Sequence, residues 1–295
     1  MGILLGLTAA LCWGSGDFLA RYATRLVGFY RTLIFMQIIG VVGLSLYLLI
    51  SGEFGRLFAH AGWQPWAWAA LAALLNIFSS LALYRAFEVG VLTVVSPIAA
   101  SYAALTALLA LLSGEVISQQ RIAGIAGVMI GVVLATAALT PPSKAQADDV
   151  QPRRYTRLTR GVGLAMLSAV GYGVMFWIFG FRVIPVLGGI APVWLVRLMT
   201  PCVLAALAMP IRQSIRVPRG WALWLICAVG LLDTTAYVAN TIGFTTGEVA
   251  VVGVLASLFS TVTVLLAWIF LRERLHWSQW VGIGVIFAGI TLISL

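Results

Sequence analysis

The sequence predicts an all-α membrane protein in which ten transmembrane helices form two inverted repeats of five. Three observations support this fold class. Hydrophobic residues occupy 62% of the 295 positions and charged residues only 9%, so the apolar surface exceeds what one soluble core can bury. Apolar stretches recur at the length of about 20 residues that a helix needs to cross a bilayer. The two halves of the chain also resemble each other.

The first half contains five predicted spans, whose continuous apolar character indicates helices rather than the strands of a barrel. The first span continues through Asp17 without a basic leader or a cleavage site, so we expect an uncleaved helix. Pro97 is expected to kink the fourth span and to act as a gating or hinge residue. The five spans cover residues 3–22, 30–50, 66–86, 92–112 and 121–140.

The second half contains five further spans, and the last of them has no formal charge. The position equivalent to Pro97, near Leu255, is not a proline. Thr245 and Glu248 stand three residues apart before the ninth span, which is the spacing of a capping box at a helix start. These spans cover residues 161–181, 190–210, 221–241, 249–270 and 277–295.

A hydrophilic linker, residues 141–160, separates the repeat 1–140 from the repeat 161–295. The stretch "ALLNIFSSLALYRAF", from Ala73, aligns with "GLLDTTAYVANTIGF", from Gly230. Further alignments follow in the same order at nearly the same offset. Because five spans per half is an odd number, the second copy must enter the membrane from the opposite face. Inverted repeats of this kind recur in secondary transporters.

The net charge of +9 would suggest nucleic-acid binding in a soluble protein, but here the basic residues punctuate the span ends. Fourteen of the 18 Lys and Arg residues lie in the connections after the odd-numbered spans. We therefore exclude nucleic acid as a partner and expect these connections to face the cytoplasm, with both termini outside. The expected location is the bacterial inner (plasma) membrane.

Charged and amide side chains at bilayer depth are the first candidates for a functional site. Asn76 and Asp233 occupy equivalent positions near the middle of their spans, where a charged aspartate costs about 2.5 to 3.5 kcal/mol. Arg197 is the expected countercharge, and Gln37 lies near its counterpart in the first half. The alternative for Asp233 with Arg197 is a structural ion pair, and for Asn76 an interhelical hydrogen bond.

Asp17 and several aromatic residues complete the set of candidates for substrate binding or coupling. Asp17 has Arg21 four residues further on, so a local ion pair on one helix face is the alternative to a binding role. The aromatic candidates could stack on a ligand or simply pack. They are Trp13, Tyr84, Tyr102, Tyr172 and Trp177.

An enzyme is not expected. The two histidines, His60 and His276, lie far apart in predicted loops, and neither a metal-ligand pattern nor a nucleophile with a nearby base is visible. The three cysteines fall inside spans, where a thiol packs as a small hydrophobe. The sequence accordingly predicts no metal and no cofactor.

The chain resembles EamA-type members of the drug/metabolite transporter superfamily. The resemblance rests on Trp13-Gly14 and on the endings "LLSGEVISQQRIAGIAGVMIGVVL" and "LLAWIFLRERLHWSQWVGIGVIFAGI". It implies alternating access around a central cavity, in transporters that often export amino acids, nucleotides or toxic organic compounds. Two features depart from the family pattern, because members commonly carry a proline in the ninth span also and many are drawn with cytoplasmic termini.

The leading hypothesis is a secondary transporter, expected to export a small polar or amphiphilic metabolite such as an amino acid, with Asp233 holding the ligand or a coupling proton. The alternative is a flippase for a lipid-linked intermediate, which would need a lateral opening between helices. The expected partners are the small-molecule substrate, protons and the lipid bilayer. A monomer or a weak homodimer is expected.

Overall fold

The computed structural model describes residues 1–55, 62–90, 92–136, 161–210, 212–213, 215–271 and 277–294. In these ranges the chain forms helices, turns and short connections, without a strand. Seven helices are long and apolar enough to cross a membrane, and three shorter apolar helices bring the total to ten. The predicted all-α membrane fold is confirmed. The linker 141–160, His60, His276 and Glu273 lie outside the described residues.

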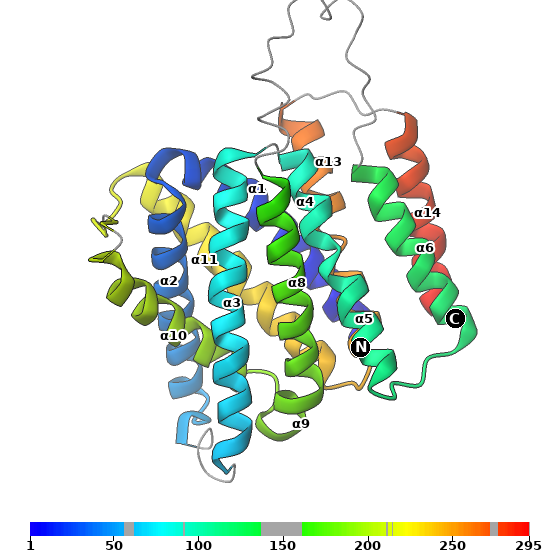
Figure 1. Cartoon of the computed structure of the whole chain (residues 1–295), viewed down its shortest axis with the longest axis horizontal. Coiled ribbons are helices and arrows are strands. Elements are labelled where there is room, and N and C mark those ends of the chain that lie inside the picture. Colours follow the sequence, from blue (N-terminus) through cyan, green and yellow to red (C-terminus); the bar gives the residue numbers. More distant parts are fainter. Residues whose placement is uncertain are drawn as a thin grey trace, which may run out of the picture.

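The first repeat agrees with the predicted spans to within a few residues at most boundaries (Figure 1). Its fourth span consists of two helices, and its fifth ends before the linker. The helices are α1 (Gly2–Val27), α2 (Phe29–Ile50), α3 (Trp63–Val89), α4 (Leu92–Ala100), α5 (Tyr102–Leu112) and α6 (Gln119–Thr136).

The second repeat has the same order of spans, with more irregular helices. Its first span, α8 (Val162–Ile178), continues through a π-helical turn (Phe179–Val183) into the short α9 (Ile184–Leu187). Its fourth span is again divided in two. The remaining helices are α10 (Ala191–Ala208), α11 (Trp221–Phe244), α12 (Val249–Ala256), α13 (Phe259–Leu271) and α14 (Trp277–Ser294).

The two repeats are inverted relative to each other and pack together in a two-fold manner. In Figure 1, α3 runs from bottom to top, whereas its equivalent α11 runs from top to bottom. Helix α1 packs on α11, and the equivalent pair, α8 on α3, is also in contact. Helices α2 and α10, which are equivalent, pack on each other, as do α6 and α14. Each of these helix pairs therefore joins one repeat to the other.

Glycines bring α6 and α14 into close contact at one edge of the protein. The carbonyl oxygen of Gly289 lies 2.8 Å from the place that a Cβ on Gly124 would occupy, and that of Gly282 lies 2.8 Å from the corresponding place on Gly131. The sequence repeat pairs Gly124 with Gly282 and Gly131 with Gly289. Gly124 therefore contacts the repeat equivalent of Gly131, and Gly131 contacts the repeat equivalent of Gly124. The contact itself obeys the two-fold relation. Larger side chains here would separate the two helices.

Two spans are interrupted at nearly equivalent places, after α4 and after α12. The first break lies at Ser101 and the second begins at Ser257. Each serine hydroxyl donates a 2.7 Å hydrogen bond to the carbonyl three residues earlier, at Ile98 and Val254. Hydroxyl bonding to the preceding turn bends helices. The helix continues through Pro97, so the interruption falls later than the kink expected there, and the second break forms without a proline.

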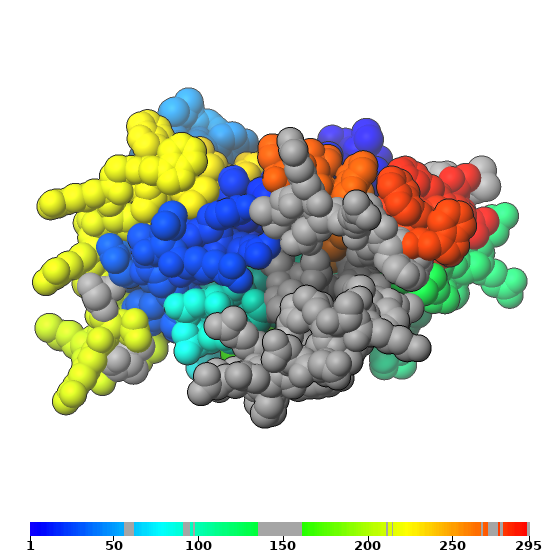
Figure 2. Space-filling model, turned by 90° about the horizontal axis from the view of Figure 1, so that it is seen from above, coloured from blue at the N-terminus to red at the C-terminus, as the bar shows by residue number. Residues whose placement is uncertain are grey.

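The protein has two distinct ends. The first, here called the basic end, carries the α1–α2, α3–α4 and α10–α11 connections, and Arg31 Nε donates to the Arg216 carbonyl across it at 3.0 Å. Figure 2 looks onto this end, where the blue segments of the first repeat lie beside the yellow and orange segments of the second. The opposite, terminal end carries both chain termini and the α5–α6 and α11–α12 connections (Figure 1).

Candidate functional site

A buried ion pair lies at the centre of the bundle. Arg197 on α10 and Asp233 on α11 approach to 2.6 Å, with side-chain exposures of 0% and 15%. Trp13 on α1 donates its indole N–H to the other carboxylate oxygen of Asp233 at 3.0 Å. One oxygen of Asp233 therefore accepts a hydrogen bond and the other lies against a cation, which offsets the cost of a charge at this depth. The pair that the sequence suggested is present in the structure.

Further polar and aromatic groups hold Arg197 in place. Arg197 donates to the amide oxygen of Gln37 on α2, and its guanidinium carbon lies 4.7 Å from the centre of the Tyr237 ring. The Tyr237 hydroxyl donates to the Asn76 amide oxygen at 2.5 Å. Gly40 leaves room for this arrangement, since a Cβ there would lie 2.9 Å from Arg197 Cδ. Gln37, Asn76 and Arg197 thus belong to one network that crosses both repeats.

A cavity lies beside this network. Aromatic side chains form most of its wall, and two carboxylates face it. Such a mixture of apolar walls with a few polar groups is typical of sites for small organic molecules. The cavity is lined by Trp13, Asp17, Leu83, Tyr84, Ala99, Tyr102, Tyr172, Phe176, Asp233, Tyr237 and Phe259.

The aromatic residues of the cavity pack on one another across helices from both repeats. Tyr102 on α5 lies near the Phe176 and Phe259 rings, with centroid separations of 5.1 Å and 6.4 Å. Tyr172 stacks on Phe176 at 6.2 Å, and its hydroxyl shares a 2.7 Å hydrogen bond with Ser80. The wall is consequently built in part from contacts between the two halves.

Asp17 differs from Asp233 because none of the described residues provides it with a countercharge. Its side chain lines the cavity and only 8% of the residue is exposed. Among the described residues, Asp17 has neither a hydrogen bond nor an ion pair, although Arg21 is among them. The local ion pair with Arg21 that the helical spacing suggested is therefore wrong. Asp17 faces inward, where Arg21 does not reach it.

Several of the predicted site residues lie outside the cavity wall. Arg197, Asn76 and Gln37 support it from behind and are buried. Trp177 points away from the cavity, donates to Ser113 Oγ at 2.7 Å and stacks on Phe181. Pro97 lies on α4, and its side chain is outside the described part of the structure.

Five cavity residues are absent from the predicted set: Leu83, Ala99, Phe176, Tyr237 and Phe259. Phe176 had a usable signal, since it follows Tyr172 by four residues and therefore shares its helix face. Phe259 begins the helix after the second break, so its orientation depends on an interruption that hydropathy does not reveal.

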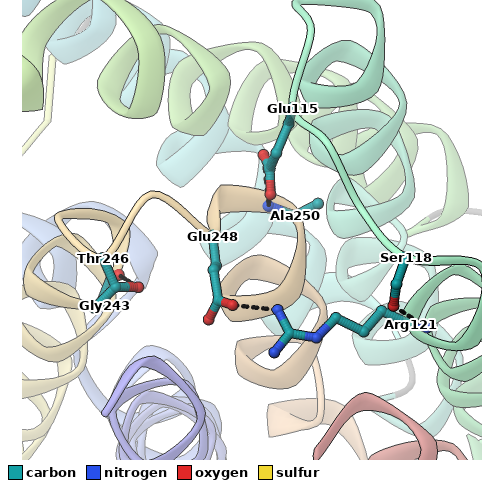
Figure 3. Close-up of polar contacts among 7 residues, drawn as sticks. All are labelled: Glu115, Ser118, Arg121, Gly243, Thr246, Glu248 and Ala250. Atoms are coloured by element: carbon teal, nitrogen blue, oxygen red, sulfur yellow. Dashed lines mark hydrogen bonds and ion pairs between the residues drawn. The ribbon is translucent and has the colours of Figure 1, made fainter. Parts of the chain in front are cut away.

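A second polar cluster joins the two repeats at the terminal end (Figure 3). We name it the Glu115–Arg121–Glu248 cluster. Arg121 at the start of α6 forms an ion pair with Glu248, which precedes α12. Both Glu115 carboxylate oxygens accept the Ala250 N–H, at 3.2 and 3.3 Å. Each contact joins the first repeat to the second, so this end cannot open unless both break.

The capping box expected at Thr245 and Glu248 does not form. Glu248 does precede α12, but it makes no capping hydrogen bond and its carboxylate pairs with Arg121. The Thr245 hydroxyl instead donates to the Ile242 carbonyl at the end of α11. The N-terminus of α12 is capped by Glu115 from the other repeat, which a local motif cannot indicate.

The fold and the cavity define a multi-pass integral membrane protein built like a secondary transporter, with inverted repeats around a central charged site. The profile of the EamA-like transporter family matches residues 1–137 and again 159–295. The chain therefore belongs to the EamA-like transporter family, in the drug/metabolite transporter superfamily.

Two further comparisons concern individual proteins. No curated protein matches the chain. One solved crystal structure is 20% identical over 99% of this chain and 95% of its own, with a TM-score of 0.71. At this identity the likeness extends to the fold.

Proposed function

We propose that the protein is a secondary active transporter that exports a small polar or amphiphilic metabolite by alternating access. The observation that carries this proposal is the cavity between two inverted repeats, which is lined at membrane depth by Asp233 of the central ion pair and by Asp17, a carboxylate without a partner among the described residues. A purely structural bundle gains nothing from Asp17 facing a cavity without a partner, because an ionised group at this depth is costly. No catalytic step is required.

The two ends of the cavity differ in a way that supports alternating access. On α3 the lining residues Leu83 and Tyr84 lie near Val89, where the helix reaches the basic end. Toward the terminal end, Phe244 packs edge-on against Phe176, and the Glu115–Arg121–Glu248 cluster lies beyond. We take the described arrangement as closed at the terminal end. If the two repeats exchanged their conformations, the terminal end would open and the basic end would close.

The orientation follows from the basic residues. The connections of the basic end carry Arg25, Arg31, Arg85, Arg216 and Arg219, and this excess favours the cytoplasmic side. On this proposal the cavity faces the cytoplasm of a bacterial cell, the terminal end faces outward, and the substrate enters from inside as in an exporter.

The direct test is counterflow in proteoliposomes with a panel of amino acids, nucleosides and aromatic amines, comparing wild type with Asp233→Asn. The variant keeps the shape of the side chain but leaves the buried Arg197 without its countercharge, so we expect a lower melting temperature, and loss of counterflow by the fraction that still elutes as folded protein. Normal counterflow by well-folded Asp233→Asn would remove Asp233 from the transport site. Headgroup-dependent lipid flipping without flux of any soluble compound would instead support the flippase.

The terminal end should respond to pH through Glu115. Burial raises the pKa of Glu115 above its ordinary value of 4.5; the Ala250 N–H opposes this rise and the charge of Glu248 adds to it. Opening would return Glu115 to water and to its ordinary pKa. Protonated Glu115 therefore favours the closed end below pH 4.5, and this preference is lost as the pH rises through the raised pKa. The charged groups drawn near it are Glu248, which adds to the rise, and Arg121, which pairs with Glu248 (Figure 3).

Thiol labelling measures this opening. Val249, which is 3% exposed, is replaced with cysteine, and the fully exposed Val116→Cys serves as the reference for the pH dependence of the thiol itself. We expect the ratio of the two labelling rates to increase with pH, and to become independent of pH in Glu115→Gln. A ratio that falls with pH, or one that Glu115→Gln leaves unchanged, would contradict the assignment.

A further inference from the structure

The charges that face the cavity do not cancel. Arg197 and Asp233 neutralise each other, but Asp17 contributes a second carboxylate for which the described residues supply no cation. The titratable groups that line the cavity with Asp17 are Asp233 and Tyr237 on α11, Tyr84 on α3, Tyr102 on α5 and Tyr172 on α8. None of them carries a positive charge. When Asp17 is ionised, the cavity therefore holds a net negative charge.

Arg197 is not available to a substrate. It is completely buried, lies behind the cavity wall and is engaged by Asp233, Gln37 and the Tyr237 ring. A zwitterion such as an amino acid would need a cation in the cavity for its carboxylate as well as an anion for its amine. The structure offers only the anion.

The remaining wall favours the same ligand chemistry. Tyr84, Tyr102, Tyr172 and Phe176 surround the cavity with ring faces and edges, and aromatic faces attract cations. The Tyr102 hydroxyl is buried without a hydrogen-bond partner in the described residues. A small aromatic cation could therefore place its charge at Asp17 and its rings among these side chains.

We propose that Asp17 is the site at which this transporter binds the charged group of an amphiphilic organic cation, such as an aromatic amine, in exchange for a proton. This inference rests on the proposed transport function and names its substrate class. In the empty cavity the Asp17 carboxyl holds a proton. When the ammonium group binds, the O–H bond breaks and the proton leaves to water, so one positive charge replaces another.

The exchange links the substrate to the proton gradient. The transporter reorients only when Asp17 holds either a proton or the substrate cation. After the cation is released outside, the cavity therefore returns to the cytoplasmic side with a proton on Asp17. Protons entering from outside would then drive the amine outward, one for one. The Asp233–Arg197 pair keeps its charge balance in both forms and acts as a fixed part of the site.

The experiment uses three probes that share an indole ring and differ in charge: tryptamine, tryptophan and indole-3-acetate. We expect counterflow in proteoliposomes for tryptamine, and Asp17→Asn should lower it roughly tenfold to a hundredfold, the worth of one hydrogen bond to a charged group. Asp17→Glu should retain part of the activity. Glu88→Gln, which removes a carboxylate outside the cavity, is the matched control and should behave like wild type.

A second measurement reads binding without transport. Tryptamine added to the purified protein in weak buffer should release about one proton per bound molecule, and Asp17→Asn should release none. Counterflow of tryptophan that equals that of tryptamine, or full tryptamine transport by Asp17→Asn, would overturn the inference while leaving the transport function intact. Absence of flux for every compound of the wider panel would instead refute the proposed function itself.

Discussion

Replacing Arg197 with methionine is expected to destabilise the folded protein by about 3 to 5 kcal/mol and to abolish transport. Arg197 is fully buried and pairs with Asp233, so its removal leaves a carboxylate at membrane depth without a countercharge. The methionine fills most of the space of the arginine stem, so lost packing adds little. Thermal unfolding in detergent can be monitored with a dye that reacts with cysteines as they become exposed. A large drop in the melting temperature would show the loss of stability.

The double variant Arg197→Met with Asp233→Asn separates charge from packing. It removes both charges, while the amide oxygen still accepts from the Trp13 indole. Replacement of a complete buried ion pair is often neutral, so most of the stability should return while transport stays absent. If the single variant is as stable as wild type, Asp233 is not desolvated and the central pair has been placed wrongly.

The fold could be predicted from sequence because its determinants are local and repeated. Apolar stretches near 20 residues long mark the spans, and the alignment of Asn76 with Asp233 reveals the repeat without any contact information. The breaks at Ser101 and Ser257 could not be predicted. A serine in an apolar helix has several ways to satisfy its hydroxyl, and only packing decides which one bends the chain.

The site was predictable only in part. The cost of burying Asp233 implies a partner, and Arg197 was the available cation within a neighbouring span. Asp17 was harder, since its spacing to Arg21 allows a pair but does not say which helix face turns inward. The partners of Arg121 and Glu115 come from the other repeat, so no local motif indicates them. Residue type alone does not identify the lining residues, because the predicted Trp177 lies outside the cavity wall while its neighbour Phe176 lines it.

Covalent closure of the terminal end is expected to stop transport completely. Arg121 and Glu248 form an ion pair that joins α6 of one repeat to the start of α12 of the other. Cysteines at both positions, in a protein whose three native cysteines are replaced with alanine, can be joined by a short bifunctional methanethiosulfonate, which forms a reducible disulfide with each thiol. Because alternating access requires this end to open once in each cycle, counterflow should fall to the level of empty liposomes and return after reduction.

The ion pair Arg85–Glu88 provides the matched control. It has the same chemistry and a similarly close approach, but both residues lie on α3, so a cross-link between cysteines there does not join the repeats. That protein should transport normally with the same reagent, as should each single-cysteine variant of the terminal end. If the cross-linked Arg121→Cys, Glu248→Cys protein still transports, the terminal end does not open during the cycle, and the substrate must leave by a path between the helices.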